Sequence, residues 1–209
     1  MFKSQRIKKL LASTATAAVV AGALIPTAAS AATFKDVSET NVHFDAIDIL
    51  SDEGIINGYS DGTFKPNNNI SRGQVAKIFA RMIEGEGELK EVFKDVPVTA
   101  DPELVKAAYE VYTQQIMTGS NGYLKPSSNM TRQQMAKVLV EGFGLEHLEG
   151  EESIVTDLDK ASPEFRDYIK ILSEYGITNV EQFRPTEPVT RAQFASFLFR
   201  TLILLDEEE

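Results

Sequence analysis

The sequence has no cysteine and no tryptophan, and its two histidines, His43 and His147, are far apart in the chain. The lack of cysteine excludes a disulfide framework and a lipid-modified N-terminal cysteine. Isolated histidines, in a chain without a nucleophile elbow motif, offer no acid–base or nucleophile pair. Carboxylates are numerous enough for a glycosidase pair, but no motif places two of them together. We therefore expect no enzymatic activity and no cofactor.

The sequence also lacks a metal-binding motif and, beyond its N-terminal region, an apolar segment long enough to span a membrane. Asp61-Gly62 could suggest calcium, but no stretch alternates carboxylates and ends in glutamate at the twelfth place, as an EF-hand loop does. The apolar run Leu202-Ile203-Leu204-Leu205 ends at once in acidic residues and is too short to span a bilayer. We expect no bound metal and no membrane anchor in the mature chain.

Residues 1–31 have the pattern of a secretory signal peptide. Four basic residues precede an apolar stretch at 10–24, and Ala29-Ser30-Ala31 supplies a small-residue cleavage site before Ala32. A retained membrane anchor is the alternative, but the apolar stretch is short and Pro26 interrupts it. The sequence therefore predicts an exported protein.

The charge of the chain is strongly acidic. It carries 21 basic and 31 acidic residues, a net charge of −10. Removal of residues 1–31 takes away four basic residues and no acidic one, which leaves a net charge of −14. Such a chain is a poor binder of nucleic acid or of an anionic membrane as a whole. Any anion that it binds must be held by a local group of basic residues.

Three related segments follow one another with a period of about 60 residues. Phe34-Lys35-Asp36-Val37 matches Phe93-Lys94-Asp95-Val96 and, more loosely, Val155-Thr156-Asp157-Leu158. Acidic, glycine-bearing connections separate the segments. The predicted organisation is a signal peptide at 1–31, repeats at 33–92, 93–152 and 153–205, and an acidic tail at 206–209.

Each repeat has the pattern of a helix, a loop and a second helix. The first helix is expected to follow an N-cap residue, which is Thr40, Asp101 or Ser162. The second is expected to begin with a capping box, in which Ser or Thr is followed three places later by Gln. The three boxes are Ser71-Arg72-Gly73-Gln74, Thr131-Arg132-Gln133-Gln134 and Thr190-Arg191-Ala192-Gln193. One such unit cannot bury its apolar stripe alone, so the three should share one all-α core, with pseudo-threefold packing as the natural closed arrangement.

The arginine in each box is unexpected. Arg72, Arg132 and Arg191 occupy the first helical position, where the helix dipole disfavours a cation by up to about 1 kcal/mol. Local rules are broken most often at functional sites. Our hypothesis is that the helix N-terminus and the arginine together bind an anion from outside. The alternative is a solvated residue or a structural salt bridge, for example to the opening aspartates.

These segments resemble the S-layer homology (SLH) domain family. The resemblance rests on Phe-Lys-Asp-Val, on the stretch Ile56-Asn57-Gly58-Tyr59-Ser60-Asp61-Gly62-Thr63-Phe64-Lys65-Pro66, and on Ser/Thr-Arg-x-Gln, which is similar to the family motif Thr-Arg-Ala-Glu. It covers residues 34 to about 201. It implies a three-pronged spindle around a central helix bundle. It also implies non-covalent binding of secondary cell wall polysaccharide, typically pyruvylated, in grooves between the repeats.

Two departures from the family pattern matter. The motif glutamate is Gln74, Gln134 or Gln193 here, which keeps the cap but removes a charge. The third repeat lacks the glycine-rich loop, so the resemblance supports its groove least of the three. No effector domain is recognised beside the repeats.

Several other residues are candidates for glycan contact. The resemblance places the family arginine at Arg72, Arg132 and Arg191 and the opening aspartate at Asp36, Asp95 and Asp157, where an aspartate capping or orienting the arginine is the alternative to direct contact. Lys65, Lys125 and Arg184 precede a proline in each loop and could reach a glycan carboxylate or be plain turn residues. Tyr59, Tyr123 and Phe183 could stack on sugar rings or pack within their loops.

Together these features predict an exported module that binds an anionic, pyruvylated secondary cell wall polysaccharide and is retained at the cell wall or surface layer. The alternative is a protein–protein or S-layer assembly module whose grooves take acidic segments of another surface protein. Neither prediction requires nucleic acid or a metal.

Overall fold

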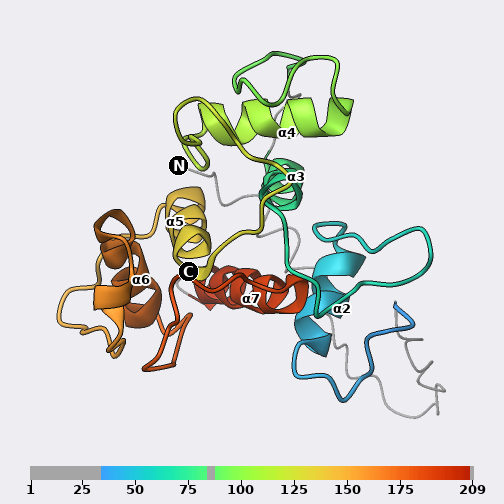
Figure 1. Ribbon diagram of the computed structural model, residues 1–209. Coiled ribbons are helices and arrows are strands. Elements are labelled where there is room, and N and C mark those ends of the chain that lie inside the picture. Colours follow the sequence, from blue (N-terminus) through green and yellow to red (C-terminus); the bar gives the residue numbers. More distant parts are fainter. Residues whose placement is uncertain (1–33, 84–87, 208–209) are drawn as a thin grey trace, which may run out of the picture.

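The computed structural model describes residues 34–83 and 88–207 (Figure 1), so the predicted signal peptide lies outside the described residues. Within these residues the chain forms helices and isolated bridges but no strand, which confirms the all-α prediction. The helices are α2 (Phe44–Asp52), α3 (Arg72–Met82), α4 (Pro102–Thr113), α5 (Arg132–Phe143), the 3-10 turns η1 (Leu158–Lys160) and η2 (Pro163–Phe165), α6 (Arg166–Glu174) and α7 (Arg191–Glu207). No helix of the described part combines the length and apolarity needed to cross a membrane.

The second helix of each repeat begins at its arginine, as the capping boxes predict. In all three, the backbone N–H of the capping Ser or Thr donates to the glutamine Oε1, at 3.0–3.2 Å. Gln74 and Gln193 return the bond through their backbone N–H groups to the Ser71 and Thr190 hydroxyls. A capping residue of this kind stabilises a helix by about 1 kcal/mol, so local sequence alone defines these three starts.

The first helices follow the prediction less closely. Asp101 caps α4 and Ser162 precedes η2, each before a proline at the first helical position. Thr40, in contrast, is not an N-cap, and α2 begins four residues later at Phe44. The Ser38 hydroxyl accepts from the backbone N–H of Thr40 and holds it in a turn. No proline follows Thr40 to set a helical φ, so the turn prevails over the helix start.

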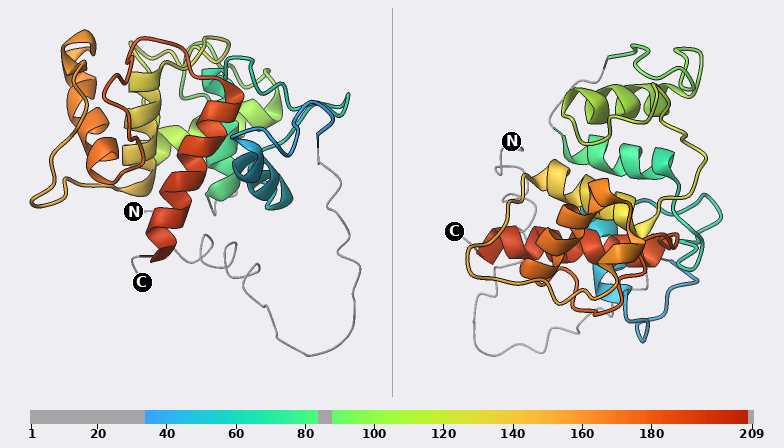
Figure 2. Two further views of the ribbon diagram at one scale, coloured as in Figure 1. Left: turned by 90° about the horizontal axis from the view of Figure 1, so that it is seen from below. Right: turned by 60° about the vertical axis from the view of Figure 1, so that its left-hand side comes forward.

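The packing of the helices crosses the repeat boundaries. Helix α3 of the first repeat packs against α4 of the second, α5 of the second against α6 of the third, and α7 of the third against α2 of the first. Figures 1 and 2 show these pairs from three directions. The buried apolar residues of all three repeats form one continuous cluster, which confirms the predicted shared core. The order is cyclic, as pseudo-threefold packing requires, while the three-pronged spindle outline stays a prediction.

A closed ring of three backbone hydrogen bonds joins the repeats just before their second helices. The N–H of Ile70 donates to Val189 O, that of Val189 to Met130 O, and that of Met130 to Ile70 O, each at 2.9 Å. The three side chains are at most 1% exposed. Each repeat thus satisfies one buried donor of its neighbour, and loss of any of these bonds within the core would leave a buried N–H unpaired.

We expect Gly142→Ala to lower the free energy of unfolding by about 1–3 kcal/mol, the usual cost of overpacking a core. A Cβ at position 142 would lie 2.4 Å from the Phe79 ring, which is fully buried. Glycine to alanine inside a helix normally stabilises, by about 1 kcal/mol, so the sign is diagnostic. Urea unfolding measures the effect, and in the matched Phe79→Leu background the penalty should largely disappear. An undiminished penalty there would show that the Phe79 contact is not its cause.

Candidate functional site

The opening aspartates fix the backbone of the loop that carries the basic residue before each proline. Asp36 accepts from the N–H groups of Phe64 and Lys65 at 2.7 and 2.8 Å. Asp95 does the same for residues 124 and 125, and Asp157 for residues 183 and 184, all at 2.7–2.9 Å. Both carboxylate oxygens are used in each case, and Asp157 is only 2% exposed. The aspartates therefore bind the loop backbone and not the motif arginines, contrary to the alternative considered from the sequence. Their direct contact with a glycan stays a prediction.

The basic residues held in this way have a left-handed backbone. The φ angles of Lys65, Lys125 and Arg184 are 59°, 56° and 55°. This conformation costs a residue with a side chain about 1–2 kcal/mol relative to glycine. Asp61, at 3.7 Å, pairs with Lys65, and Glu187, at 3.5 Å, with Arg184. Strained backbone at three basic residues makes them candidates for a functional role, which stays a prediction.

Each motif arginine joins its own helix to the loop of another repeat. Arg72 Nε donates to Leu124 O at 2.6 Å, Arg191 Nε donates to Phe64 O at 2.7 Å, and Arg132 Nε donates to the carbonyl of Phe183. The accepting residue is always the one whose N–H is bound by an opening aspartate. Arginine and aspartate thus hold opposite sides of the same peptide segment.

The free backbone donors of the sequence hypothesis are not available. The N–H groups of Arg72 and Gly73 donate to Ser128 O and Pro126 O, both at 2.9 Å. The corresponding pairs at residues 132–133 and 191–192 donate to carbonyls at 187 and 185 and at 68 and 66. The prediction that these helix N-termini bind an external anion is therefore wrong, because closure of the three repeats uses their donors.

The three arginines differ in exposure. Arg72 is half-buried, while Arg132 and Arg191 are 7% and 5% exposed. Burial lowers the pKa of all three guanidinium groups. Within the described residues, no carboxylate lies within ion-pair distance of any of them. The terminal nitrogens of Arg72 have no hydrogen-bond partner in that part of the chain, so this arginine keeps an open donor face.

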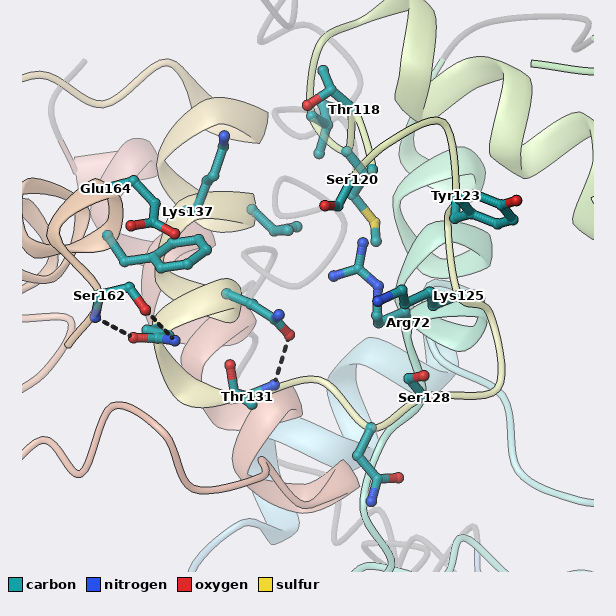
Figure 3. Close-up of a pocket in the computed structure, with 18 residues that line it drawn as sticks. Arg72, Thr118, Ser120, Tyr123, Lys125, Ser128, Thr131, Lys137, Ser162 and Glu164 are labelled. Carbon is teal, nitrogen blue, oxygen red and sulfur yellow. Dashed lines mark hydrogen bonds between the residues drawn. The ribbon is translucent and has the colours of Figure 1, made fainter. Parts of the chain in front are cut away.

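Arg72 opens onto a groove along α5 with a cavity volume of about 610 Å³. We call it the α5 groove, and its charged residues are Arg72, Lys125, Lys137 and Glu164. Figure 3 shows Arg72 and Lys125 on one side of the opening, and Lys137 and Glu164 on the other. Its polar residues include Thr118, Ser120, Ser128, Gln133, Gln134 and Ser162. Three cations, one carboxylate and many hydroxyl and amide groups suit an anionic, hydroxyl-rich ligand.

A second and smaller hollow lies along α3, with a volume of about 150 Å³. This α3 groove is lined by Tyr59, Gln74, Lys77, Arg81, Glu103 and Arg191, among others. Tyr59 is half-buried there, and its ring lies 4.0 Å from Lys65 Nζ and 5.0 Å from Arg191 Cζ. Its hydroxyl accepts from Gln74 Nε2 at 3.1 Å. The Tyr59 ring thus already has cationic neighbours.

In the third repeat, a buried aromatic ring of the loop packs against the motif arginine of the second repeat. The Arg132 guanidinium lies 4.6 Å from the Phe183 ring centre and 5.3 Å from that of Phe197. His43 Nδ1 meets the Ser196 hydroxyl at 2.7 Å, and burial lowers the pKa of this histidine. Phe183 is fully buried. The prediction that Phe183 stacks on a sugar is therefore wrong: Phe183 is the counterpart of the buried Phe64, whose ring centre lies 4.4 Å from Arg191 Cζ.

Tyr123 and two lysines complete the comparison of predicted and found residues. Tyr123 is 42% exposed, lies beside Lys94 and lines the α5 groove. Lys77 and Lys137 also line the grooves but were missed by sequence reasoning. One sequence signal could have identified them. A lysine recurs five places after the motif arginine in the first two repeats, among apolar residues, and the third repeat has Ser196 at this position.

Comparison with known proteins agrees with the family resemblance seen in the sequence. The model of the S-layer homology domain matches residues 33–76, 92–136 and 156–195, more than half of the chain. The Surface-layer 125 kDa protein of Lysinibacillus sphaericus is 34% identical over 214 residues, which cover 99% of this chain and 18% of that protein. For S-layer protein sap of Bacillus anthracis the identity is 28%, covering 96% of this chain and 25% of the relative. An endoglucanase of Bacillus sp. (strain KSM-635) is 37% identical over 123 residues, covering 58% of this chain and 12% of the relative.

We expect Asp157→Ala to lower the free energy of unfolding by about 3 kcal/mol, because it leaves two N–H groups of a buried segment without their charged acceptor. Asp36→Ala, where Lys65 N is more accessible to water, should cost about half as much. Thermal or urea unfolding of the two variants measures the difference. Hydrogen exchange at the amide of residue 183 should accelerate only in the Asp157 variant, and equal costs would contradict this account.

We expect Lys125→Gly to leave the protein at least as stable, with a gain of about 0.5 kcal/mol, while it weakens ligand binding. Release of the left-handed strain exceeds the extra chain entropy of glycine by about this amount. Lys125→Asn is the matched control, since asparagine tolerates the same φ without the charge. Denaturant unfolding reports stability and a wall-binding assay reports retention. A clear loss of stability in both variants would refute the strain argument.

Proposed function

Because the chain belongs to the S-layer homology domain family, we propose that it is a cell-surface module that binds anionic secondary cell wall polysaccharide non-covalently. The observation that supports this proposal is the α5 groove, in which Arg72, Lys125 and Lys137 surround a hollow large enough for a sugar residue. These three cations lie on a chain whose overall charge is −10. The attraction for an anion is thus local to the groove.

The chemistry of the groove favours a carboxylate attached to a sugar. The Nε of Arg72 is committed to Leu124 O, which fixes the guanidinium plane and leaves the two terminal nitrogens for a ligand. Such a fork matches a carboxylate in a two-point contact. The surrounding Ser, Thr and Gln side chains suit sugar hydroxyls. A pyruvate ketal, which presents one carboxylate on a sugar ring, meets both requirements.

A binding role suits the groove better than an enzymatic one. Hydrolysis of a glycosidic bond by the usual mechanism needs two carboxylates about 5–10 Å apart. Glu164 is the one acidic residue that lines the α5 groove in the described structure. The relatives that match this chain include S-layer proteins and an endoglucanase, and the chain spans a quarter or less of each of those named above. The proposal also includes export of the protein, its retention at the cell wall and its binding to other surface-layer proteins.

The test is retention on purified cell walls, compared before and after chemical removal of the polysaccharide from peptidoglycan. We expect binding to intact walls and its loss on stripped walls. Lys137→Gln should weaken binding about tenfold, because it removes one charge-assisted contact worth about 1.4 kcal/mol. Lys106→Gln, an exposed lysine on α4 outside both grooves, is the matched control and should bind as the unchanged protein does.

Equal retention on stripped walls would overturn the proposal. If retention then required another surface protein, the chain would instead be an assembly module. Sugar released on incubation with the purified polysaccharide would contradict a purely binding role.

A further inference from the structure

The α3 and α5 grooves are built from corresponding parts of successive repeats. Each has a second helix as its floor, the loop before that helix on one side and the start of the next repeat on the other. The motif arginine of the preceding repeat in the cycle completes it, which is Arg191 in the α3 groove and Arg72 in the α5 groove. Their volumes nevertheless differ, at about 150 and 610 Å³.

An ion-pair cluster occupies the α3 groove. Lys77 Nζ lies 2.8 Å from Glu103 Oε2 and 2.5 Å from Asp101 Oδ2. Arg81 Nη2 lies 2.8 Å from the other oxygen of Glu103, Oε1. The Glu103 carboxylate therefore bridges two cations with its two oxygens. The hydrogen bond from Lys77, followed by that from Arg81, lowers the pKa of Glu103, so this carboxylate is charged at neutral pH.

The same cluster is absent from the α5 groove. Lys137 holds the position of Lys77, but Glu141 replaces Arg81, and Glu164 stands where Glu103 does. The Glu141 carboxylate accepts from the Tyr168 hydroxyl at 2.6 Å, and Lys137 Nζ lies 5.6 Å from the centre of the Tyr168 ring. In the described residues no carboxylate is within ion-pair distance of Lys137. Its charge is thus available to a ligand, whereas that of Lys77 is neutralised.

We propose that Glu103 is an internal competitor for the ligand, whose carboxylate occupies the anion position of the α3 groove and closes it. This inference rests on the proposed function, since it takes a carboxylate on a sugar as the ligand. The chain then presents one open anion site, along α5, and one closed site, along α3. Glu103 sets the number of sites, because it satisfies Lys77 and Arg81 together as a ligand carboxylate would.

The probe is the pyruvate anion, followed by NMR of the backbone amides in the two grooves. In the unchanged protein, we expect added pyruvate to shift the amides of Gly119 and Gln134 in the α5 groove, and to leave Gly58 and Gln74 in the α3 groove unshifted. Glu103→Gln frees Arg81 and leaves Lys77 paired with Asp101 alone, so the number of responding grooves should rise from one to two. The side chain of Glu103 is half exposed, at 53%, so the variant is expected to fold.

The matched control is Glu164→Gln, the same substitution at the corresponding position of the open groove, which should add no second site. Adding Lys77→Gln to Glu103→Gln should remove the new response. The inference is overturned if Gly58 and Gln74 stay unshifted in Glu103→Gln, or if they already shift in the unchanged protein at the same pyruvate concentration. The wall assay separately tests the proposed function, so loss of polysaccharide binding with a retained pyruvate response would overturn only that function.

Discussion

The ring of backbone hydrogen bonds among Ile70, Met130 and Val189 is the constraint on which the rest of the structure depends. It sets the three second helices in cyclic register, and each helix then packs against the first helix of the next repeat. The first backbone donors of each second helix are satisfied by a neighbouring loop, and the motif arginine reinforces that contact through Nε. The grooves follow from this closure, because each is bounded by parts of three repeats.

Closure also explains why the motif arginine tolerates an unfavourable helix dipole. One edge of the guanidinium joins two repeats, and in Arg72 the opposite edge faces the α5 groove. The sequence argument that the arginine occupies this unfavourable position for a reason therefore still holds, but the reason differs from the one predicted. The reason includes assembly of the three repeats, while the proposed recognition of an anion uses what remains of the side chain.

Local sequence predicts the elements of this chain well and their partners poorly. The capping boxes define the starts of α3, α5 and α7, because a cap is a contact between residues three apart. Thr40 failed as an N-cap because a nearby serine holds it in a turn. The acceptors of the helix N-terminal donors lie in other repeats, over 50 residues away, so no local pattern could show that they are occupied. The difference between the two grooves likewise depends on a contact that no local pattern shows, the ion pair between Lys77 and Glu103, which are 26 residues apart.

The bond between Arg191 Nη2 and Asn57 O joins residues 134 positions apart. Together with the packing of α2 against α7, it means that the first repeat finds part of its interface only in the last one. A nascent chain can form its helices in order, but it cannot bury the last surface of α2 until the third repeat has been synthesised. Such long-range contacts slow folding through the entropy of loop closure. Cooperative folding of all three repeats, rather than stepwise growth from one end, is the consequence of the cyclic closure.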